Sequence, residues 1–206
     1  MSASNKDSDL RIWRNFRSGD KVAFQKIYFE HYRFLYNYCR KFTTDGPLVE
    51  DIIQDLFINI LVRKDRLNDT DNIRLYLFSS IRRSLFKALN KKEYKVTDHF
   101  DSMNAAFHLD DGVDPNYGED DEQNRTLRIL YKAINNLGGR QKEIVYMKYF
   151  SGLNNKEIAD VLNVSYQTVR NTLCNSLRNI RRDFEEDSPK GKLMVLFHLF
   201  KSFNHF

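Results

Sequence analysis

The chain has 206 residues, 41% of them hydrophobic and 30% charged, and its formal net charge is +5. These values are ordinary for a soluble protein of one or two domains. Glycine and proline are scarce, and long stretches show helical spacing without sustained alternation, so we predict an all-α fold. No apolar run is long enough for a secretory signal or a membrane span, and we therefore expect a cytoplasmic protein.

The charge is distributed unevenly along the chain. Residues 97–124 hold nine acidic residues and no Lys or Arg, which leaves the remainder at +14, because +5 minus −9 is +14. The positive charge on the two parts of the chain that flank this stretch suggests a polyanionic partner. The low periodicity of the acidic stretch predicts a flexible linker over 96–124. We expect two helical domains, at 7–95 and 125–184, and an apolar tail helix at 185–206.

The first domain should begin with long helical segments. Within residues 7–42, Gly19 and Asp20 form a helix start signal, and the apolar residues that follow are spaced as one helical stripe. Aromatic residues are dense here, and the simplest interpretation is the aromatic core of a helical bundle. The stripe consists of Phe24, Ile27, Tyr28, Leu35, Cys39 and Phe42.

A turn at 43–47 should lead into a second long helix. Its sequence combines a wide apolar face with an opposite polar face, and a polar face of this kind is usually solvated. The apolar face consists of Ile52, Ile53, Leu56, Phe57, Ile60 and Leu61, and the polar face of Glu50, Asp51, Gln54, Asp55 and Asn59.

Polar residues from Asp65 to Asp71 predict a loop, and a third helix is expected from about Asn72 to Lys92. Cations beside exposed rings are suited to gripping the backbone of a separated strand and stacking its bases. A lysine-rich solvated face is the alternative. The expected buried side is Leu75, Phe78, Ile81, Leu85 and Leu89. The expected exposed side carries Arg74, Arg82, Arg83, Lys87, Lys91 and Lys92, with Tyr76 and Phe86 between them.

The stretch at 157–171 predicts two short helices separated by a tight turn. Asn163 tolerates the left-handed backbone that ends a helix, and Ser165 is a good N-cap for the next helix. This pattern is typical of a helix-turn-helix, although a helical hairpin with a solvated polar face is the alternative. The apolar side would hold Ile158, Ala159, Leu162, Val169, Leu173, Leu177 and Ile180. The outward side chains for base edges would be Tyr166, Gln167, Thr168, Arg170 and Asn171, with Arg178, Arg181 and Arg182 for phosphates.

Other chemistry has little support in the sequence. Cys39 and Cys174 lie far apart without metal-ligand spacing, and we expect both to be small buried hydrophobic residues. The five histidines are scattered, and no catalytic or metal-binding spacing is visible, so we expect no catalytic residues, no metal, no cofactor and no small-molecule substrate. The tail could fold onto its own domain, or it could dock a partner protein or a second copy.

Four blocks of the sequence, in this order, resemble the extracytoplasmic-function (ECF) group of sigma-70-type sigma factors, over roughly residues 10 to 184. They are GDKVAFQKIYFEHYRFLYNY, EDIIQDLFINIL, NIRLYLFSSIRRSLFKALNKK and LGGRQKEIVYMKYFSGLNNKEIADVLNVSYQTVRNTLCNSLRNIRR.

The resemblance implies a role for each block. The helix with Asp51, Gln54, Asp55 and Asn59 would dock onto the clamp helices of core RNA polymerase. The helix-turn-helix, with Tyr166, Gln167, Thr168, Arg170, Asn171 and Arg178, would read the −35 promoter element. The loop from Arg63 to Asn72 and the helix after it would capture the −10 element, with Arg74, Arg82, Arg83 and Lys87 holding the non-template strand. The acidic linker would line a cationic channel of the polymerase.

The chain also departs from the family pattern. Leu61 or Val62 stands where a Trp is usual, Asn163 stands where Gly is common at the turn, and Thr172 replaces a frequent Arg. The −35 sequence preference therefore does not transfer. We expect an RNA polymerase sigma factor that binds core polymerase, promoter DNA and an anti-sigma factor. The alternative is a stand-alone helix-turn-helix regulator, which would need neither the acidic linker nor the polymerase dock.

Overall fold

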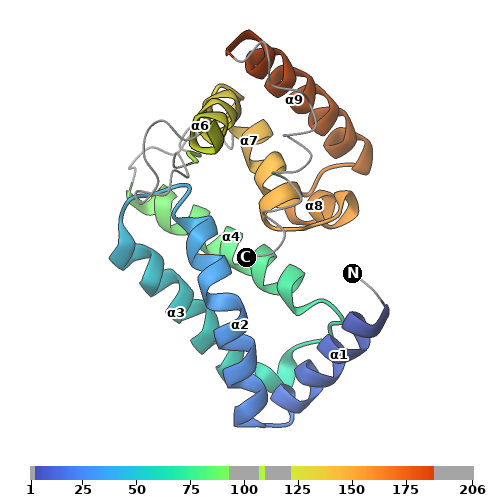
Figure 1. Cartoon of the computed structure of the whole chain (residues 1–206). Coiled ribbons are helices and arrows are strands. Elements are labelled where there is room, and N and C mark those ends of the chain that lie inside the picture. Colours follow the sequence, from blue (N-terminus) through green and yellow to red (C-terminus); the bar gives the residue numbers. More distant parts are fainter. Residues whose placement is uncertain (1–2, 93–106, 110–121, 188–206) are drawn as a thin grey trace. The chain divides into compact units, whose positions relative to one another are not determined.

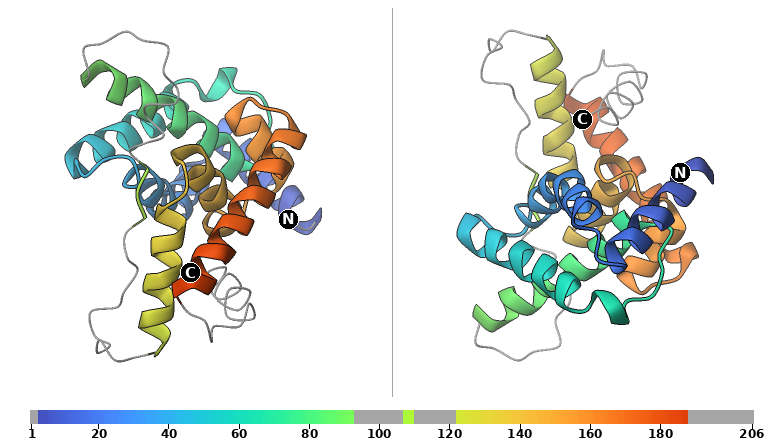
Figure 2. Two further views of the ribbon diagram at one scale, coloured as in Figure 1. Left: turned by 90° about the horizontal axis from the view of Figure 1, so that it is seen from above. Right: turned by 90° about the horizontal axis from the view of Figure 1, so that it is seen from below.

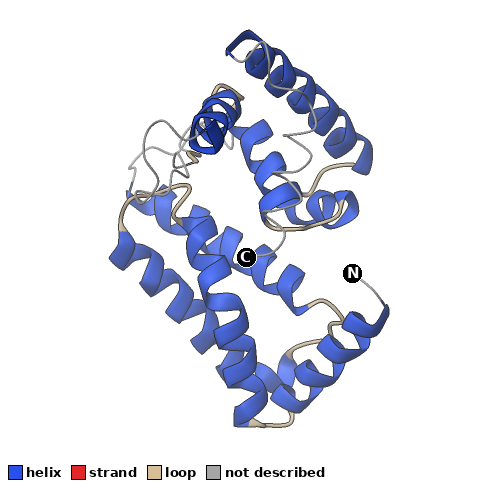
Figure 3. Cartoon of the chain, viewed as in Figure 1, coloured by secondary structure: helices blue, strands red, loops and turns tan. Residues whose placement is uncertain are grey.

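The computed structural model describes residues 3–92, 107–109 and 122–187 (Figure 1). All regular structure in these residues is helical (Figure 3), so the predicted all-α fold is confirmed. The chain divides into two compact units, at Met1–Thr97 and Asp98–Phe206, which are called the N-terminal and the C-terminal unit below.

The N-terminal unit is a helical bundle in which α2 packs against α1, α3 and α4, and α3 packs against α4 (Figure 1). A short 3-10 turn, η1, follows α3. The elements are α1 (Ala3–Arg17), α2 (Lys21–Cys39), α3 (Gly46–Val62), η1 (Lys64–Arg66) and α4 (Ile73–Lys92).

Two aspartates fix where the long helices begin. The side chain of Asp20 accepts hydrogen bonds from the backbone N–H groups of Val22 (2.8 Å) and Ala23 (3.3 Å). Gly19 before it has a φ of 98°, which residues with a side chain rarely adopt. Asp45 accepts from the N–H of Leu48 at 3.0 Å, with a proline in the first turn of α3. The predicted start at Gly19 and Asp20 is therefore confirmed.

Aromatic rings fill the core of this bundle, as predicted. Tyr38 and Phe78 place their ring centroids 4.3 Å apart, and Trp13 lies 4.9 Å from Tyr76. These side chains join α1 and α2 to α4, which holds the elements in one cluster. The fully buried members of this core include Trp13, Phe16, Ile27, Leu35, Tyr38, Ile53, Ile73, Leu77, Phe78 and Ile81.

The C-terminal unit is organised around its last helix. Helix α9 packs against α6, α7 and α8, and Figure 2 shows α6 and α9 running side by side. A π-helical turn, η2, follows α7. The elements are α6 (Glu122–Asn135), α7 (Gly139–Val145), η2 (Tyr146–Phe150), α8 (Asn155–Leu162) and α9 (Tyr166–Asp187).

Part of the predicted linker belongs to the packed core of the C-terminal unit, which the sequence did not predict. Phe107 and Leu109 are buried, and Asn135 at the end of α6 hydrogen bonds to the backbone of Leu109. Helix α6 also begins at Glu122, within the residues assigned to the linker. The apolar tail helix was predicted at 185–206; residues 185–187 form the end of α9, and 188–206 lie outside the described residues.

The two cysteines differ in environment. Cys39 is fully buried at the end of α2, as expected, and burial raises the pKa of its thiol to about 12. Cys174 in α9 is exposed, so the expectation that it is buried is wrong. It lies outside the buried stripe of α9, which includes Leu173 and Ile180.

Candidate functional site

The first candidate surface is the outer face of α3. Asp51, Gln54, Asp55 and Asn59 are all exposed there, because the opposite face of α3 is buried by α2 and α4. Three large apolar side chains share the exposed face, and their exposed fractions are 49%, 45% and 74% for Ile58, Leu61 and Val62. The expectation that Leu61 belongs to the buried face is wrong, because the buried stripe ends at Ile60.

This combination of acids and exposed apolar residues is unusual for a solvated face. Scattered exposed apolar residues need no explanation, but here three lie within five positions at the end of one helix. The acids at Asp51 and Asp55 add negative charge to the same helix. The surface therefore suits a partner helix that is both basic and apolar.

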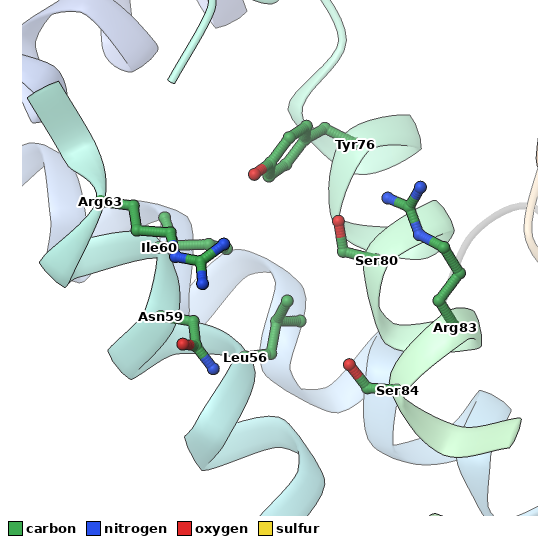
Figure 4. Close-up of a pocket in the computed structure, with 8 residues that line it drawn as sticks. All are labelled: Leu56, Asn59, Ile60, Arg63, Tyr76, Ser80, Arg83 and Ser84. Carbon is green, nitrogen blue, oxygen red and sulfur yellow. The ribbon is translucent and has the colours of Figure 1, made fainter. Parts of the chain in front are cut away.

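The second candidate surface is a groove between α3 and α4. One pocket of about 260 Å³ is bordered by Asn59 and Arg63 from the end of α3, and by side chains of α4 on the opposite side (Figure 4). A neighbouring pocket shares Asn59 and Ser84 and also includes Asp55 and Lys87. The first pocket is lined by Leu56, Asn59, Ile60, Arg63, Tyr76, Ser80, Arg83 and Ser84.

The groove has the chemistry of a nucleic-acid site. Arg63, Arg83 and Lys87 are exposed cations, and the hydroxyls of Tyr76, Ser80 and Ser84 can hydrogen bond to base edges or phosphates. Tyr76 was predicted as an exposed ring beside the cations, whereas Ser80 and Ser84 were not among the predicted site residues. Ser80 and Ser84 are one turn apart and in phase with Tyr76, so a helical wheel centred on Arg83 could have indicated them.

Two of the predicted strand-holding arginines are not free at the surface. Arg82 is only 5% exposed, with its guanidinium carbon 4.5 Å from the centroid of Phe86, so the expectation that it lies on the exposed side is wrong. Arg74 is half-buried, with its guanidinium 4.2 Å from the Phe34 ring. Both cations are held by the bundle's aromatic residues.

The expected exposed rings are also part of the packing. Tyr76 lies against Trp13, and Phe86 lies 5.2 Å from Phe42 in an edge-to-face contact. They are half-buried rather than open platforms for stacked bases. Of the two rings, Tyr76 lines the pocket and Phe86 does not, so Tyr76 is the ring that a ligand in the groove could contact.

The loop between α3 and α4 is tied to α1. Asp69 forms ion pairs with Arg14 (2.7 Å) and Arg17, and these hydrogen bonds, that of Arg14 foremost, lower the pKa of the carboxyl. The indole N–H of Trp13 donates to the carbonyl of Asn68 at 2.9 Å. These contacts pre-organise the loop, which lowers the entropy cost of any ligand binding there.

Asn72, the last residue of this loop, has a structural role. It is 7% exposed, and its side-chain oxygen accepts from the backbone N–H of Leu75 at 2.9 Å, which caps α4. Asp9 of α1 accepts from the N–H of Ile73 at 3.0 Å. The predicted DNA contact of Asn72 therefore falls on a buried helix cap.

The third candidate surface is the helix-turn-helix formed by α8 and α9. Asn163 has a φ of 51° and a ψ of 49°, the left-handed conformation expected for the turn. The N–H of Val164 donates back to the carbonyl of Ala159 at 3.0 Å, and Ser165 caps α9 by accepting from the N–H of Thr168 at 3.0 Å. The predicted break between the two helices is confirmed.

The side chains predicted to face outward do so. Gln167 and Asn171 are joined by a hydrogen bond of 2.9 Å, and the phenol of Tyr166 is 54% exposed. Arg182 pairs with Asp183 at 3.0 Å, which reduces the positive charge available from it. The exposed residues are Tyr166, Gln167, Thr168, Arg170, Asn171, Arg178, Arg181 and Arg182.

Helix α7 contacts the end of α8 through Arg140. Arg140 donates to the carbonyl of Leu162 at 3.3 Å, immediately before the turn, and lies 3.6 Å from the carboxylate of Glu143. Glu143 is fully buried. Arg140 therefore links the buried carboxylate of Glu143 in α7 to the last carbonyl of α8, which ties α7 to the C-terminal end of α8.

Comparison of the chain with known proteins assigns it to a protein family. The family model described as Sigma-70 region 2 matches residues 27–94, and the model described as Sigma-70, region 4 matches residues 127–180. The chain belongs to the ECF group of the sigma-70 family. The α3–α4 groove of this sigma factor lies within its region 2, and the helix-turn-helix lies within its region 4.

Named relatives agree with this assignment. The ECF RNA polymerase sigma factor SigL of Mycobacterium tuberculosis is 21% identical over 172 residues, covering 82% of this chain and 93% of SigL. The ferric citrate uptake sigma factor FecI of Escherichia coli strain K12 is 22% identical over 158 residues, covering 77% and 88% of the two chains.

Two solved structures share the fold. CnrH in complex with the cytosolic domain of CnrY has a TM-score of 0.57 and 16% identity, covering 87% of this chain and 99% of that chain. The sigma factor RpoE in complex with the anti-sigma factor NepR, from Bartonella quintana, has a TM-score of 0.55 and 18% identity, covering 82% and 98%.

Two features are absent from the part of the chain that the structure describes. None of the helices in the described ranges combines the length and the apolar character needed to cross a membrane. The same ranges contain no group of three or more His, Cys, Asp or Glu side chains placed to bind a metal ion.

Proposed function

We propose that this sigma factor binds core RNA polymerase through the outer face of α3, and directs it to promoters through the α3–α4 groove and the N-terminal half of α9. It would act in the cytoplasm, without a cofactor and without catalytic chemistry of its own. The observation that carries this proposal is the presence of a region 2 unit and a region 4 unit in one chain, each with its own cationic surface.

The dock is proposed at Asp51, Gln54, Asp55 and Asn59, widened by the exposed apolar residues Ile58, Leu61 and Val62. A clamp helix of the polymerase with basic and apolar side chains would complement this surface. Asp55 and Asn59 also border the groove between α3 and α4, so they stand where the polymerase surface and the DNA surface meet.

The −10 element is proposed to bind in the α3–α4 groove. A pocket of about 260 Å³ with hydroxyl and cationic lining can receive one extruded base while Arg63, Arg83 and Lys87 contact the neighbouring phosphates. Arg74 and Arg82 would act indirectly, since aromatic rings hold their guanidinium groups. Asn72 would position the loop by capping α4.

The −35 element is proposed to bind the start of α9. In a helix-turn-helix, the N-terminal residues of the recognition helix face the base edges. The exposed residues at that end of α9 are Tyr166, Gln167, Thr168, Arg170 and Asn171. Arg178 is two turns further along, where it can reach a phosphate.

An anti-sigma factor is proposed as a regulatory partner. Support comes from the solved structure of RpoE with the anti-sigma factor NepR, whose fold this chain shares. The outer face of α3 cannot bind an anti-sigma factor and the polymerase at the same time. An inhibitor that covers Ile58, Leu61 and Val62 would therefore block polymerase binding directly.

The experiment is run-off transcription with purified bacterial core polymerase on genomic fragments. Wild-type protein should give discrete transcripts, and the charge-reversed variant Asp51→Lys with Asp55→Lys should lose them. A matched control, Asp7→Lys with Glu30→Lys, changes the same charge at exposed positions of α1 and α2 and should retain them. Absence of transcripts together with tight duplex binding by the protein alone would instead favour a stand-alone regulator.

A further inference from the structure

Helix α1 lies before residues 27–94, which the region 2 model matches, and yet it contacts both ends of the loop at 63–72 between α3 and α4. At one end, Arg17 donates to the carbonyl oxygen of Lys64 at 3.3 Å. At the other end, the carboxylate of Asp9 accepts from the backbone N–H of Ile73 at 3.0 Å. One helix therefore holds the loop where it leaves α3 and where it enters α4.

Asp69 holds the middle of the loop with both oxygens of its carboxylate. One oxygen accepts from Nε of Arg14 at 2.7 Å, and the other accepts from the guanidinium of Arg17, one turn further along α1. A single exposed ion pair contributes little, because its side chains separate easily. A carboxylate that two arginines share is held in two directions at once. Arg14, Arg17 and Asp69 are called the loop latch below.

Trp13 connects the loop to the pocket between α3 and α4. It is the single tryptophan of the chain, and it is fully buried. Its indole N–H donates to the carbonyl of Asn68, the residue before Asp69, at 2.9 Å. Its ring also lies 4.9 Å from that of Tyr76, which lines the pocket (Figure 4). The position of the loop and the position of one pocket wall therefore depend on the same side chain.

We propose that the loop latch positions the loop and, through Trp13, the ring of Tyr76, so that the pocket distinguishes the base that it receives. Arg14, Arg17 and Asp69 are then determinants of −10 specificity that do not touch the DNA. The statement about specificity rests on the proposed function. The statement about loop position does not, because it concerns only contacts within the N-terminal unit.

A pocket needs fixed walls to discriminate between bases. Specificity is a difference between two affinities, and a loop that can rearrange contacts a wrong base nearly as well as the right one. The latch orders the loop before any ligand arrives. Because Arg14 and Asp69 are exposed, opening the latch should change the order of the loop much more than the stability of the whole unit.

The arginines of the latch could instead contact a DNA phosphate themselves, and the two roles predict different signs. If they contact phosphates, loss of the Asp69 charge frees two cations and strengthens binding of a DNA strand, whereas loss of the arginines weakens it. If they position the loop, loss of either side of the latch has the same effect on base discrimination.

Two variants open the latch from opposite sides. Asp69→Asn removes the shared charge, and Arg14→Gln with Arg17→Gln removes both donors. Asp69→Glu keeps the carboxylate and should rescue the latch. Asp65→Asn is the matched control, because it removes the same charge from the same loop, and Asp65 pairs with its neighbour Lys64 at 3.0 Å rather than with α1. Circular dichroism shows whether each variant retains its helices, and the arginine variant keeps the test valid if Asp69→Asn does not fold.

The order of the loop is measured through Trp13. Because the chain has one tryptophan, its indole N–H gives a single NMR cross-peak, and the exchange of this proton with water reports its bond to Asn68. We expect exchange to be about fivefold faster in both latch variants and no faster still when the two are combined. Asp65→Asn and Asp69→Glu should resemble wild type. Equal exchange in all the proteins would overturn the latch.

Specificity is measured with the full chain bound to core polymerase. The probe is a fluorescent single strand that carries the −10 element of a promoter found by run-off transcription, beside strands with one abasic nucleotide at each position in turn. Wild type should bind most weakly when the captured base is missing. This difference in affinity should shrink about fivefold in both latch variants, while Asp65→Asn and Asp69→Glu should keep it and core binding should stay unchanged.

Three other results have distinct meanings. An undiminished difference in both latch variants would overturn the role in specificity and leave the proposed function intact. Tighter strand binding by Asp69→Asn with weaker binding by the arginine variant would show direct phosphate contacts, and would also overturn it. A wild-type protein that yields no promoter would contradict the proposed function and the role in specificity with it, and the exchange of the Trp13 indole proton would still decide whether the latch positions the loop.

Discussion

The guanidinium carbon of Arg82 lies 4.5 Å from the centroid of the Phe86 ring, one turn further along α4. Phe86 packs in turn against Phe42, so Arg82 belongs to the aromatic core despite its charge. Arg83, its neighbour in sequence, is exposed and borders the α3–α4 pocket. Two adjacent arginines on one helix therefore have different tasks, one in packing and one at the surface.

We expect Arg82→Ala to lower the free energy of unfolding by about 1–2 kcal/mol, through loss of the cation–π contact and of the buried side-chain stem. Arg83→Ala should change it by less than about 0.5 kcal/mol, as is usual for exposed positions. Urea denaturation of the two variants measures both values. An equal loss of stability in the two proteins would contradict the assignment of Arg82 to the core.

Replacing Arg82 and replacing Arg83 should also have different effects on function. Arg83→Ala removes a cation from the groove, so promoter opening, followed by permanganate reactivity of unpaired thymines, should fall while binding to core polymerase is retained. Arg82→Ala should reduce both only as far as it reduces the folded fraction. If opening depends on Arg82 alone, the groove is not the strand-holding surface.

Helical periodicity predicted α4 but not the edges of its buried face. Leu75 and Leu89 were expected in the core and are half-buried, whereas Leu77 is fully buried. The reason is that α4 packs against α1, α2 and α3 at once, which makes its buried face wide. Which of Arg82 and Arg83 falls inside that face depends on the neighbouring helices, and the spacing within one helix does not contain that information.

The helix-turn-helix was predictable because its determinants are local. The cap at Ser165, the left-handed Asn163 and the apolar positions Ile158, Ala159 and Leu162 lie within a few residues of one another. The contact between Asn135 and the backbone of Leu109 could not be found in this way. Its partners, Leu109 and Asn135, are separated by 26 positions and share no periodic pattern.

The turn between α8 and α9 gives a second test of stability. Asn163 adopts a φ of 51°, in the left-handed region. Glycine adopts this conformation easily, whereas it costs a residue such as alanine, which has a β-carbon and no side-chain amide to hydrogen bond locally, about 1–2 kcal/mol. We expect Asn163→Ala to lower the unfolding free energy by about 1 kcal/mol, and Asn163→Gly to leave it within about 0.5 kcal/mol. Thermal denaturation measures the difference; an alanine variant as stable as the glycine variant would show that the turn is not strained.

The cysteines give a test of the fold itself. Cys39 is buried and its thiol pKa is raised to about 12, so it should be unreactive while the N-terminal unit is folded. Cys174 is exposed on α9 and should react at once with a coloured disulfide reagent. We expect one thiol to react in the native protein and two in denaturant. The variant Cys174→Ser should show no fast reaction, and rapid labelling of Cys39 in that variant would contradict the packing of α2.

His31 should make stability depend on pH. Burial, and secondarily the charge of Arg74, lower the pKa of this half-buried imidazole to about 4 from its usual value near 6.5. The unfolded chain therefore takes up a proton as the pH falls through 6.5, while the folded chain does not until about 4, so stability is lost across this window as the pH falls. The loss attributable to His31 by pH 4 is about 3 kcal/mol, because the two pKa values differ by about 2.5 and each pH unit between them contributes about 1.4 kcal/mol, less a small amount for the folded imidazole that is already protonated at pH 4. Urea denaturation between pH 7.5 and about 4 should therefore show a shallower decline in His31→Gln than in wild type, whereas His108→Gln, at an exposed histidine, should follow wild type. Parallel declines in all three proteins would mean that the imidazole of His31 is protonated in the folded state as readily as in the unfolded one.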